Sequence, residues 1–219
     1  MSKSVAIRNS LVGNWPYPTA LDQAVQAIED HDYSKFNFTA GGSHNALEHV
    51  RRNRDVLAQH QMFEGCFLDA LVGHNVNVMA YTPGYISEML RLCNRTLLRA
   101  AGAPLEIGFP VTVYRGFSGI GRRRVARSYS WSLSIEVACW FALSRGAANP
   151  AVARAKLTNL DAVFAYIAER DEDEVLAMPA NYRLVKMAAE EMRRLADVHQ
   201  ARIDAANEAE MQALGRSYT

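Results

Sequence analysis

The sequence predicts an α+β protein with a helical N-terminal part, a mainly antiparallel sheet and a C-terminal helix. Apolar residues recur at helical spacing from residue 20 to about residue 103, and short runs with period-two alternation begin at Phe109. Because the helices precede the strands instead of alternating with them, an antiparallel sheet is favoured over βαβ units. We expect a helical part (1–103) in the same domain as a strand-rich core (104–187), followed by a C-terminal helical tail (188–219).

The 219 residues suit one generous domain of globular composition. The sequence has 24 Lys and Arg residues against 23 Asp and Glu residues. The resulting net charge of +1 favours neither a nucleic acid nor an anionic membrane as partner. The three cysteines are widely spaced, which supports neither a disulfide framework nor a zinc site, and we expect no metal. Without a signal-peptide core or a membrane-length apolar run, a soluble cytoplasmic protein is predicted, and delivery into another cell stays open.

Helix signals support the N-terminal helices. Thr82-Pro83-Gly84 is typical of a helix start, and Gly102 with Pro104 is typical of a helix end. The helical spacing lies in LDQAVQAIED, NALEHVRRNRDVLAQHQMFEGCFLDALV and YISEMLRLCNRTLLRAA.

Six short runs predict the strands: PVTVYRGF, RSYSWSLS, VARAKLTN, AVFAYIAE, DEVLAMP and NYRLVKM. Between the second and third, IEVACWFALSRG has helical spacing and predicts a short helix. A long terminal helix is predicted from about Met187. Neither GxGxxG nor GxxxxGK[ST] opens a helix, so other groups would have to hold the phosphates of a nucleotide.

The first of three motifs that could carry chemistry is Val113-Tyr114-Arg115-Gly116. An arginine at the end of an apolar strand can bind a phosphate or carboxylate with its planar guanidinium, and the following glycine lets a ligand approach the backbone. A surface ion pair is the alternative for Arg115.

The second motif is a row of serines. Strand alternation places Ser130, Ser132 and Ser134 on one face, where their hydroxyls can orient a carboxylate, and points Trp131 to the other face. The alternative is the solvated face of an edge strand.

The third motif is the acidic run 169–174, which directly precedes the apolar run Val175-Leu176-Ala177-Met178. Such a run is typical of a solvated turn. Glu172 and Glu174, however, share one face at the start of a strand. A carboxylate beside buried structure can stabilise a developing cation or accept a proton.

In the order Arg, Ser-x-Ser, Glu-x-Glu on successive strands, these motifs resemble the arginine-serine-glutamate class of mono-ADP-ribosyltransferases, which includes bacterial toxins and arginine-specific transferases. The resemblance covers most of residues 81–187. It is carried by YRGF, SYSWSLSIEVACWFA, ERDEDEVLAMP and the preceding helix YTPGYISEMLRLCNRTLLRA. Trp131 replaces a threonine of the family pattern, and the connection from Arg115 to Ser130 is short. The resemblance implies a β-sandwich core of the ADP-ribosyltransferase type, with NAD as co-substrate.

The resemblance also implies roles for the residues of the three motifs. Glu174 would hold the ribose hydroxyl and stabilise the oxocarbenium-like transition state. Ser130 would orient Glu174, and Ser132 would be a lesser partner. Arg115 would bind the phosphate region of NAD, and the Gly116 backbone would contact the nicotinamide amide.

Four further NAD-binding residues follow from the same resemblance: Phe141, Arg145, Tyr85 and Asn94. Phe141 and Arg145 match an aromatic and a basic residue near the loop SRGAANP, with a core aromatic and a solvated arginine as alternatives. Tyr85 and Asn94 come from the preceding helix, and packing and capping are the alternatives for them.

Glu172 bears on the acceptor, because the family places a glutamate there in enzymes that modify arginine. A carboxylate can steer a guanidinium and help to remove its proton, so an arginine of a target protein is the expected acceptor. Glu169 and Asp171 would extend the negative field.

Other acceptors and functions stay open. An arginine-rich segment could instead hold the phosphates of RNA or DNA, as in toxin-antitoxin or phage-defence enzymes, or it could bind the NAD pyrophosphate or form a solvated turn. Its members are Arg122, Arg123, Arg124 and Arg127. Water as acceptor would make the protein an NAD glycohydrolase, and a catalytically silent interaction module is a further alternative. An antitoxin or immunity partner is possible under the toxin hypothesis.

Overall fold

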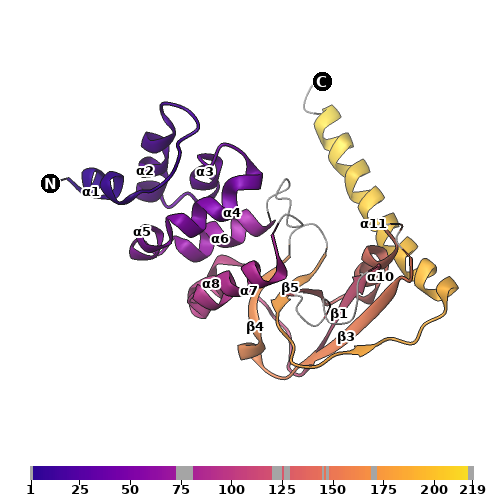
Figure 1. Cartoon of the computed structure of the whole chain (residues 1–219). Coiled ribbons are helices and arrows are strands. Elements are labelled where there is room, and N and C mark those ends of the chain that lie inside the picture. The colour runs from indigo at the N-terminus through magenta and orange to yellow at the C-terminus, as the bar shows by residue number, and fades with distance from the viewer. Residues whose placement is uncertain are drawn as a thin grey trace. The chain divides into compact units, whose positions relative to one another are not determined.

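The computed structural model describes residues 2–72, 81–119, 125, 129–144, 146, 148–168 and 172–216 (Figure 1). The chain divides into two compact units, Met1–Gly102 and Ala103–Thr219. The first is helical, and the second contains the sheet and the C-terminal helix. The protein is therefore α+β, as the pattern of the sequence predicts.

The helical unit is built around one almost fully buried helix. That helix, α6, contacts α3, α4, α5 and α8, and its aromatic residues Phe63 and Phe67 are almost completely buried. The predicted helix signals at Thr82 and Gly102 are confirmed, since these residues flank α7 and α8. The described helices are α1 (Lys3–Ser10), α2 (Ala20–Asp30), α3 (Tyr33–Phe38), α4 (Ser43–Arg52), α5 (Arg54–Gln59), α6 (Phe63–Val72), α7 (Pro83–Leu92) and α8 (Arg95–Ala101).

The second unit holds a six-stranded antiparallel sheet with the strand order β4-β5-β2-β1-β3-β6. Its elements are β1 (Val111–Phe117), β2 (Ser130–Ser132), α10 (Ile135–Ser144), β3 (Ala151–Leu157), the 3-10 helix η2 (Leu160–Ala162), β4 (Val163–Ile167), β5 (Glu174–Ala177), β6 (Arg183–Leu184) and α11 (Ala189–Arg216). All strands that the structure describes belong to this one sheet. The expected β-sandwich would have two separate sheets, and they are not seen in this part of the chain.

The two faces of the sheet are covered differently. One face forms an apolar core that includes Val113, Trp131 and Val175. The opposite face packs against α10 and the first turns of α11, through Val152 of β3 and Met192 of α11 among others. Beyond these turns, α11 extends away from the sheet and its residues are mostly exposed (Figure 1). Alternate side chains of β1 and β2 therefore point to the apolar core on one face of the sheet and toward α10 on the other.

Gly116 allows α10 to lie directly on β1. A Cβ atom at this position would stand 1.8 Å from the backbone oxygen of Ala138 and 2.7 Å from the backbone nitrogen of Ala142. Both atoms are backbone and cannot move without shifting the helix, so only glycine fits here. The close approach that the sequence predicts for a ligand is made by the helix itself.

A search of the described residues for a helix of sufficient length and apolarity to cross a membrane finds none.

Candidate functional site

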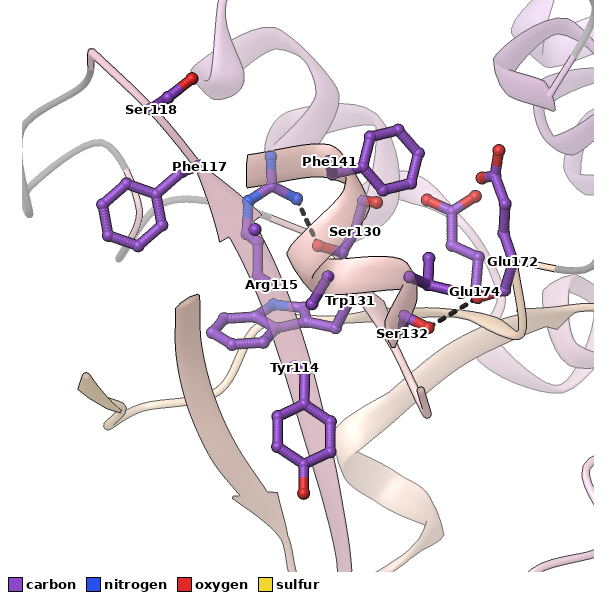
Figure 2. A pocket seen from close by; sticks show the side chains of 13 residues that line it. Tyr114, Arg115, Phe117, Ser118, Ser130, Trp131, Ser132, Phe141, Glu172 and Glu174 are labelled. Atoms are coloured by element: carbon purple, nitrogen blue, oxygen red, sulfur yellow. Dashed lines mark hydrogen bonds between the residues drawn. The ribbon is translucent and has the colours of Figure 1, made fainter. Parts of the chain in front are cut away.

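A pocket of about 120 Å³ opens where β1, β2, β5 and α10 meet (Figure 2). It brings together residues that lie up to 60 positions apart in the sequence. Its lining residues are Tyr114, Arg115, Gly116, Phe117, Ser118, Ser130, Trp131, Ser132, Val137, Ala138, Phe141, Glu172 and Glu174. Each of the three predicted motifs thus contributes to one cavity.

Strand register explains why the serines and the glutamate meet. Ser132 pairs with Tyr114 of β1 on one side and with Glu174 of β5 on the other. Paired residues on neighbouring strands point to the same face, so these three side chains form one row across the sheet. Ser130 lies two residues before Ser132 and shares its face, whereas Trp131 is 2% exposed in the core of the other face, as predicted.

Hydrogen bonds hold the segment that carries the two glutamates. The hydroxyl of Ser132 donates to the backbone oxygen of Glu172 at 2.6 Å, and the N–H of Leu133 donates to the backbone oxygen of Asp173 at 3.0 Å. The hydroxyl of Tyr166 donates to the carboxylate of Asp173 at 2.7 Å. Asp173 itself has a left-handed backbone, with φ at 46°. Ser132 therefore anchors the backbone beside Glu174, a contact that the resemblance does not predict.

Strand alternation places Arg115 on the face of the sheet opposite the serines. Val113 and Phe117, two residues away on either side, share this face and pack in the apolar core. Its guanidinium reaches the first residue of β2 and donates a hydrogen bond from Nη1 to the backbone oxygen of Ser130 (Figure 2). The side chain is half-buried. Arg115 thus connects β1 to the strand that carries the serines.

Tyr129 is a neighbour of the pocket that the sequence motifs do not indicate. Burial raises the pKa of its phenol to about 12, the positive charge of Arg115 lowers it and the negative charge of Glu174 raises it. The phenol therefore lies within electrostatic reach of both Arg115 and Glu174. Its place just before Ser130 is the one sequence signal that could have indicated it.

A buried hydroxyl at the end of β1 also lines the pocket. Ser118 is 8% exposed, and its Oγ has no hydrogen-bond partner among the residues that the structure describes. A buried hydroxyl gains free energy from any partner it acquires, so Ser118 favours a polar group of a ligand here.

The prediction that Ser134 continues the serine row is wrong. β2 ends at Ser132, and Ser134 caps α10 instead. Its Oγ accepts a hydrogen bond from the N–H of Val137 at 3.2 Å and donates one to Glu136 Oε2 at 2.7 Å. A serine just before an apolar helix is a common N-cap, and this competing preference decides its place.

Tyr85 and Asn94 belong to the helical unit and have structural contacts there. The hydroxyl of Tyr85 donates to Glu48 Oε2 at 3.0 Å. The Asn94 side chain caps α8, and the backbone N–H of Asn94 donates to the carboxylate of Glu64 at 2.7 Å. These contacts match the alternative roles of packing for Tyr85 and capping for Asn94. Because the two units are described separately, the NAD-binding role of both residues stays a prediction.

Several predicted residues lie outside the described residues, and their contribution to the site stays a prediction. They are Arg122, Arg123, Arg124, Arg127, Arg145, Glu169 and Asp171. By contrast, Phe141 and Gly116 are described and line the pocket.

Comparison with protein-family models, curated proteins and solved structures finds no match for this chain.

Proposed function

We propose that the protein is an NAD-dependent mono-ADP-ribosyltransferase that modifies an arginine of a target protein. The observation that carries the proposal is the meeting of Arg115, Ser130, Ser132, Glu172 and Glu174 in one pocket. A glycosyl transfer needs a fixed carboxylate beside the sugar and groups that hold this carboxylate in place. The pocket supplies both.

NAD fits this pocket as a substrate that inserts one end. The volume of about 120 Å³ is smaller than the ~300–1,000 Å³ of a typical ligand pocket, so it suits the nicotinamide ring and not the whole dinucleotide. Phe141 and Ser118 line the pocket, and the Ser118 hydroxyl has no partner among the residues that the structure describes. They provide an apolar surface and a polar contact for such a ring and its amide.

Glu174 is the group we assign to the transition state. As the bond between nicotinamide and the ribose C1′ breaks, nicotinamide leaves with the bonding electrons and positive charge develops on the sugar. A carboxylate at the start of β5 stabilises that charge and accepts a hydrogen bond from a ribose hydroxyl. Ser132 holds the preceding backbone by its hydrogen bond to Glu172, which limits the movement of Glu174.

Glu172 is the group we assign to the acceptor. Its side chain lines the same pocket two residues before Glu174, and Figure 2 shows both carboxylates on one side of the cavity near Phe141. An acceptor guanidinium loses one proton as its nitrogen bonds to C1′, and Glu172 can bind the guanidinium and take this proton.

Arg115 has a positioning role in this proposal. Its guanidinium donates to the backbone oxygen of Ser130 and so fixes the start of β2. Its charge also lies near the pocket, where it acts on Tyr129 and can attract the phosphates of NAD.

The test is transfer of label from NAD, labelled in its adenylate part, to protein in a cell lysate. Wild-type protein should label acceptors, and Glu174→Gln should reduce the rate at least ~100-fold, because it removes the charge that stabilises the transition state. Glu190→Gln, an exposed glutamate at the start of α11, is the matched control and should keep the wild-type rate. Circular dichroism melting checks that both variants stay folded.

Glu172→Gln separates acceptor chemistry from the cleavage of NAD. This variant should lose arginine transfer by about 100-fold while it still releases nicotinamide into water. Wild-type protein that releases only free ADP-ribose would instead identify an NAD glycohydrolase. Equal transfer by wild type and Glu174→Gln would overturn the proposal.

A further inference from the structure

A second and larger cavity lies at the β6 edge of the sheet. Its volume is about 1010 Å³, and it is an open groove between β3, β6 and the segment that connects β5 to β6. It is lined by Thr112, Arg154, Ala155, Lys156, Leu157, Thr158, Ala162, Met178, Pro179, Ala180, Asn181, Tyr182 and Arg183. None of these residues lines the pocket of the two glutamates.

The groove carries three cations and no carboxylate in its lining. Arg154 and Lys156 are alternate residues of β3 and share one face, and Arg183 of β6 pairs with Arg154. All three side chains are exposed, and none of them forms an ion pair with the residues that the structure describes. Three neighbouring cations without acidic partners produce a positive potential that favours a polyanion.

An aromatic residue, Tyr182, also lines the groove, and its ring packs partly against the apolar core on the face opposite the three cations. Tyr182 lines the groove directly before Arg183 and is only partly buried, and Asn181 adds an amide that can donate or accept hydrogen bonds. Cations that hold a phosphate backbone, combined with an aromatic ring on which a base can stack, are typical of sites for single-stranded nucleic acid. An acidic peptide would use the cations but not the ring.

The groove and the glutamate pocket lie on one row of the sheet. Register pairs join Arg183 to Arg154, Arg154 to Tyr114, Tyr114 to Ser132 and Ser132 to Glu174. Three strand spacings separate Arg154 from Glu174, a distance of roughly 14 Å. Arg154 of the groove is thus paired with Tyr114, which lines the pocket.

We propose that this groove binds the phosphodiester backbone of single-stranded nucleic acid, with Arg154, Lys156 and Arg183 on the phosphates and Tyr182 stacked on a base. None of the residues that line the groove belongs to the arginine-rich segment 122–127 of the sequence. The inference does not depend on the proposed transferase activity, because binding is measured without NAD.

The test is fluorescence anisotropy with a labelled single-stranded oligonucleotide of about 12 nucleotides, which is within the site size of comparable binding folds. Three phosphate contacts at ~0.7 counterion each predict a log-log salt slope of about −2, or about 20-fold weaker binding between about 50 and 200 mM salt. The triple variant Arg154→Ala, Lys156→Ala, Arg183→Ala should lose this salt dependence and bind at least ~20-fold more weakly at about 50 mM salt.

The matched control removes three exposed arginines of α11 instead: Arg193→Ala, Arg194→Ala and Arg202→Ala. It lowers the net charge by the same amount and should keep the wild-type affinity and slope. Loss of binding in both triple variants would assign the effect to net charge and overturn the proposal. Full binding by the groove variant would overturn it as well, because the contacts would then lie elsewhere.

Tyr182 distinguishes nucleic acid from a general anion. Tyr182→Leu should weaken oligonucleotide binding by roughly tenfold without a change of the salt slope, and Tyr182→Phe should keep wild-type affinity because it keeps the stacking ring. A polyglutamate peptide of equal charge should compete poorly with the oligonucleotide. Competition by the peptide at equal concentration, together with unchanged binding by Tyr182→Leu, would overturn the assignment to nucleic acid.

Discussion

The two units of the chain differ in where their polar side chains lie. In the helical unit, the buried side chains of Asn53 and His49 contact other parts of the same unit. Asn53 exchanges two hydrogen bonds with the backbone of Val12, at 2.8 and 3.0 Å, and His49 lies 3.2 Å from the hydroxyl of Thr39. In the sheet unit, the polar residues of β1, β2 and β5 gather instead around a cavity.

This difference leads us to expect a ligand in the sheet unit, where the proposed function also places the chemistry. A buried polar group that is paired within the fold contributes to a unique packing and is not available to a ligand. A polar group that lines a cavity keeps some of its hydrogen-bonding capacity for a ligand, as the hydroxyl of Ser118 does. We therefore expect changes in the helical unit to affect stability, and changes around the pocket to affect binding.

The largest expected effect comes from a substitution that disrupts the packing of α10 on β1. Gly116→Ala should destabilise the sheet unit by about 3 kcal/mol or more, because the new Cβ meets the backbone of α10 at 1.8 Å. Urea denaturation followed by tryptophan fluorescence measures it. Gly108→Ala is the matched control, since its Cβ would meet no heavy atom within 4 Å, and it should stay within about 1 kcal/mol of wild type. Equal stability of the two variants would contradict the close contact between β1 and α10.

A smaller expected effect is a difference between the two units in the pH dependence of their stability. Burial, with a further contribution from Arg52, lowers the pKa of His49 from 6.5 to about 4. The unfolded chain then binds a proton that the folded chain does not. The free energy of unfolding of the helical unit should therefore fall by about 3 kcal/mol as the pH falls from about 6.5 to about 4. Below that range His49 should cause no further loss of stability.

Fluorotryptophan NMR follows both units in one sample. Trp15 makes an edge contact with the His49 ring at 5.3 Å between centroids, and Trp131 lies in the core of the sheet unit. In urea, the folded signal of Trp15 should weaken with acid before that of Trp131 does. His49→Gln should remove this acid sensitivity, and His31→Gln, an exposed histidine of the same unit, should keep it. Simultaneous loss of both signals would argue against two separately behaving units.

The smallest expected effect reports on the electrostatics of the pocket. The phenol of Tyr129, with its pKa raised to about 12 by burial, should titrate at lower pH in Glu174→Gln, because a repelling negative charge is lost. Arg115→Gln should shift the titration the opposite way. Tyrosinate absorbance measures both shifts, with Tyr129→Phe identifying the signal. An unchanged titration in both variants would place Arg115 and Glu174 too far from Tyr129 for the arrangement described above.

The types of element could be predicted from the sequence because their signals are local. The helical spacing around Thr82, the alternation in 111–117 and the apolar helix at 135–144 each depend on neighbouring residues. Alternation also predicted that Trp131 faces away from the serines. Ser134 shows the limit of such a pattern, because a capping preference competes with the strand and ends it.

What the sequence by itself determined is therefore the set of helices and strands and the face on which each motif lies. Only the tertiary structure decided the strand order, which sets Glu174 beside Ser132 and Arg183 beside Arg154. It also decided that Arg115 holds the backbone of Ser130 and that Asn94 caps a helix in the other unit. The physical reason is that pairing between distant strands depends on packing across the whole unit, which no local spacing encodes.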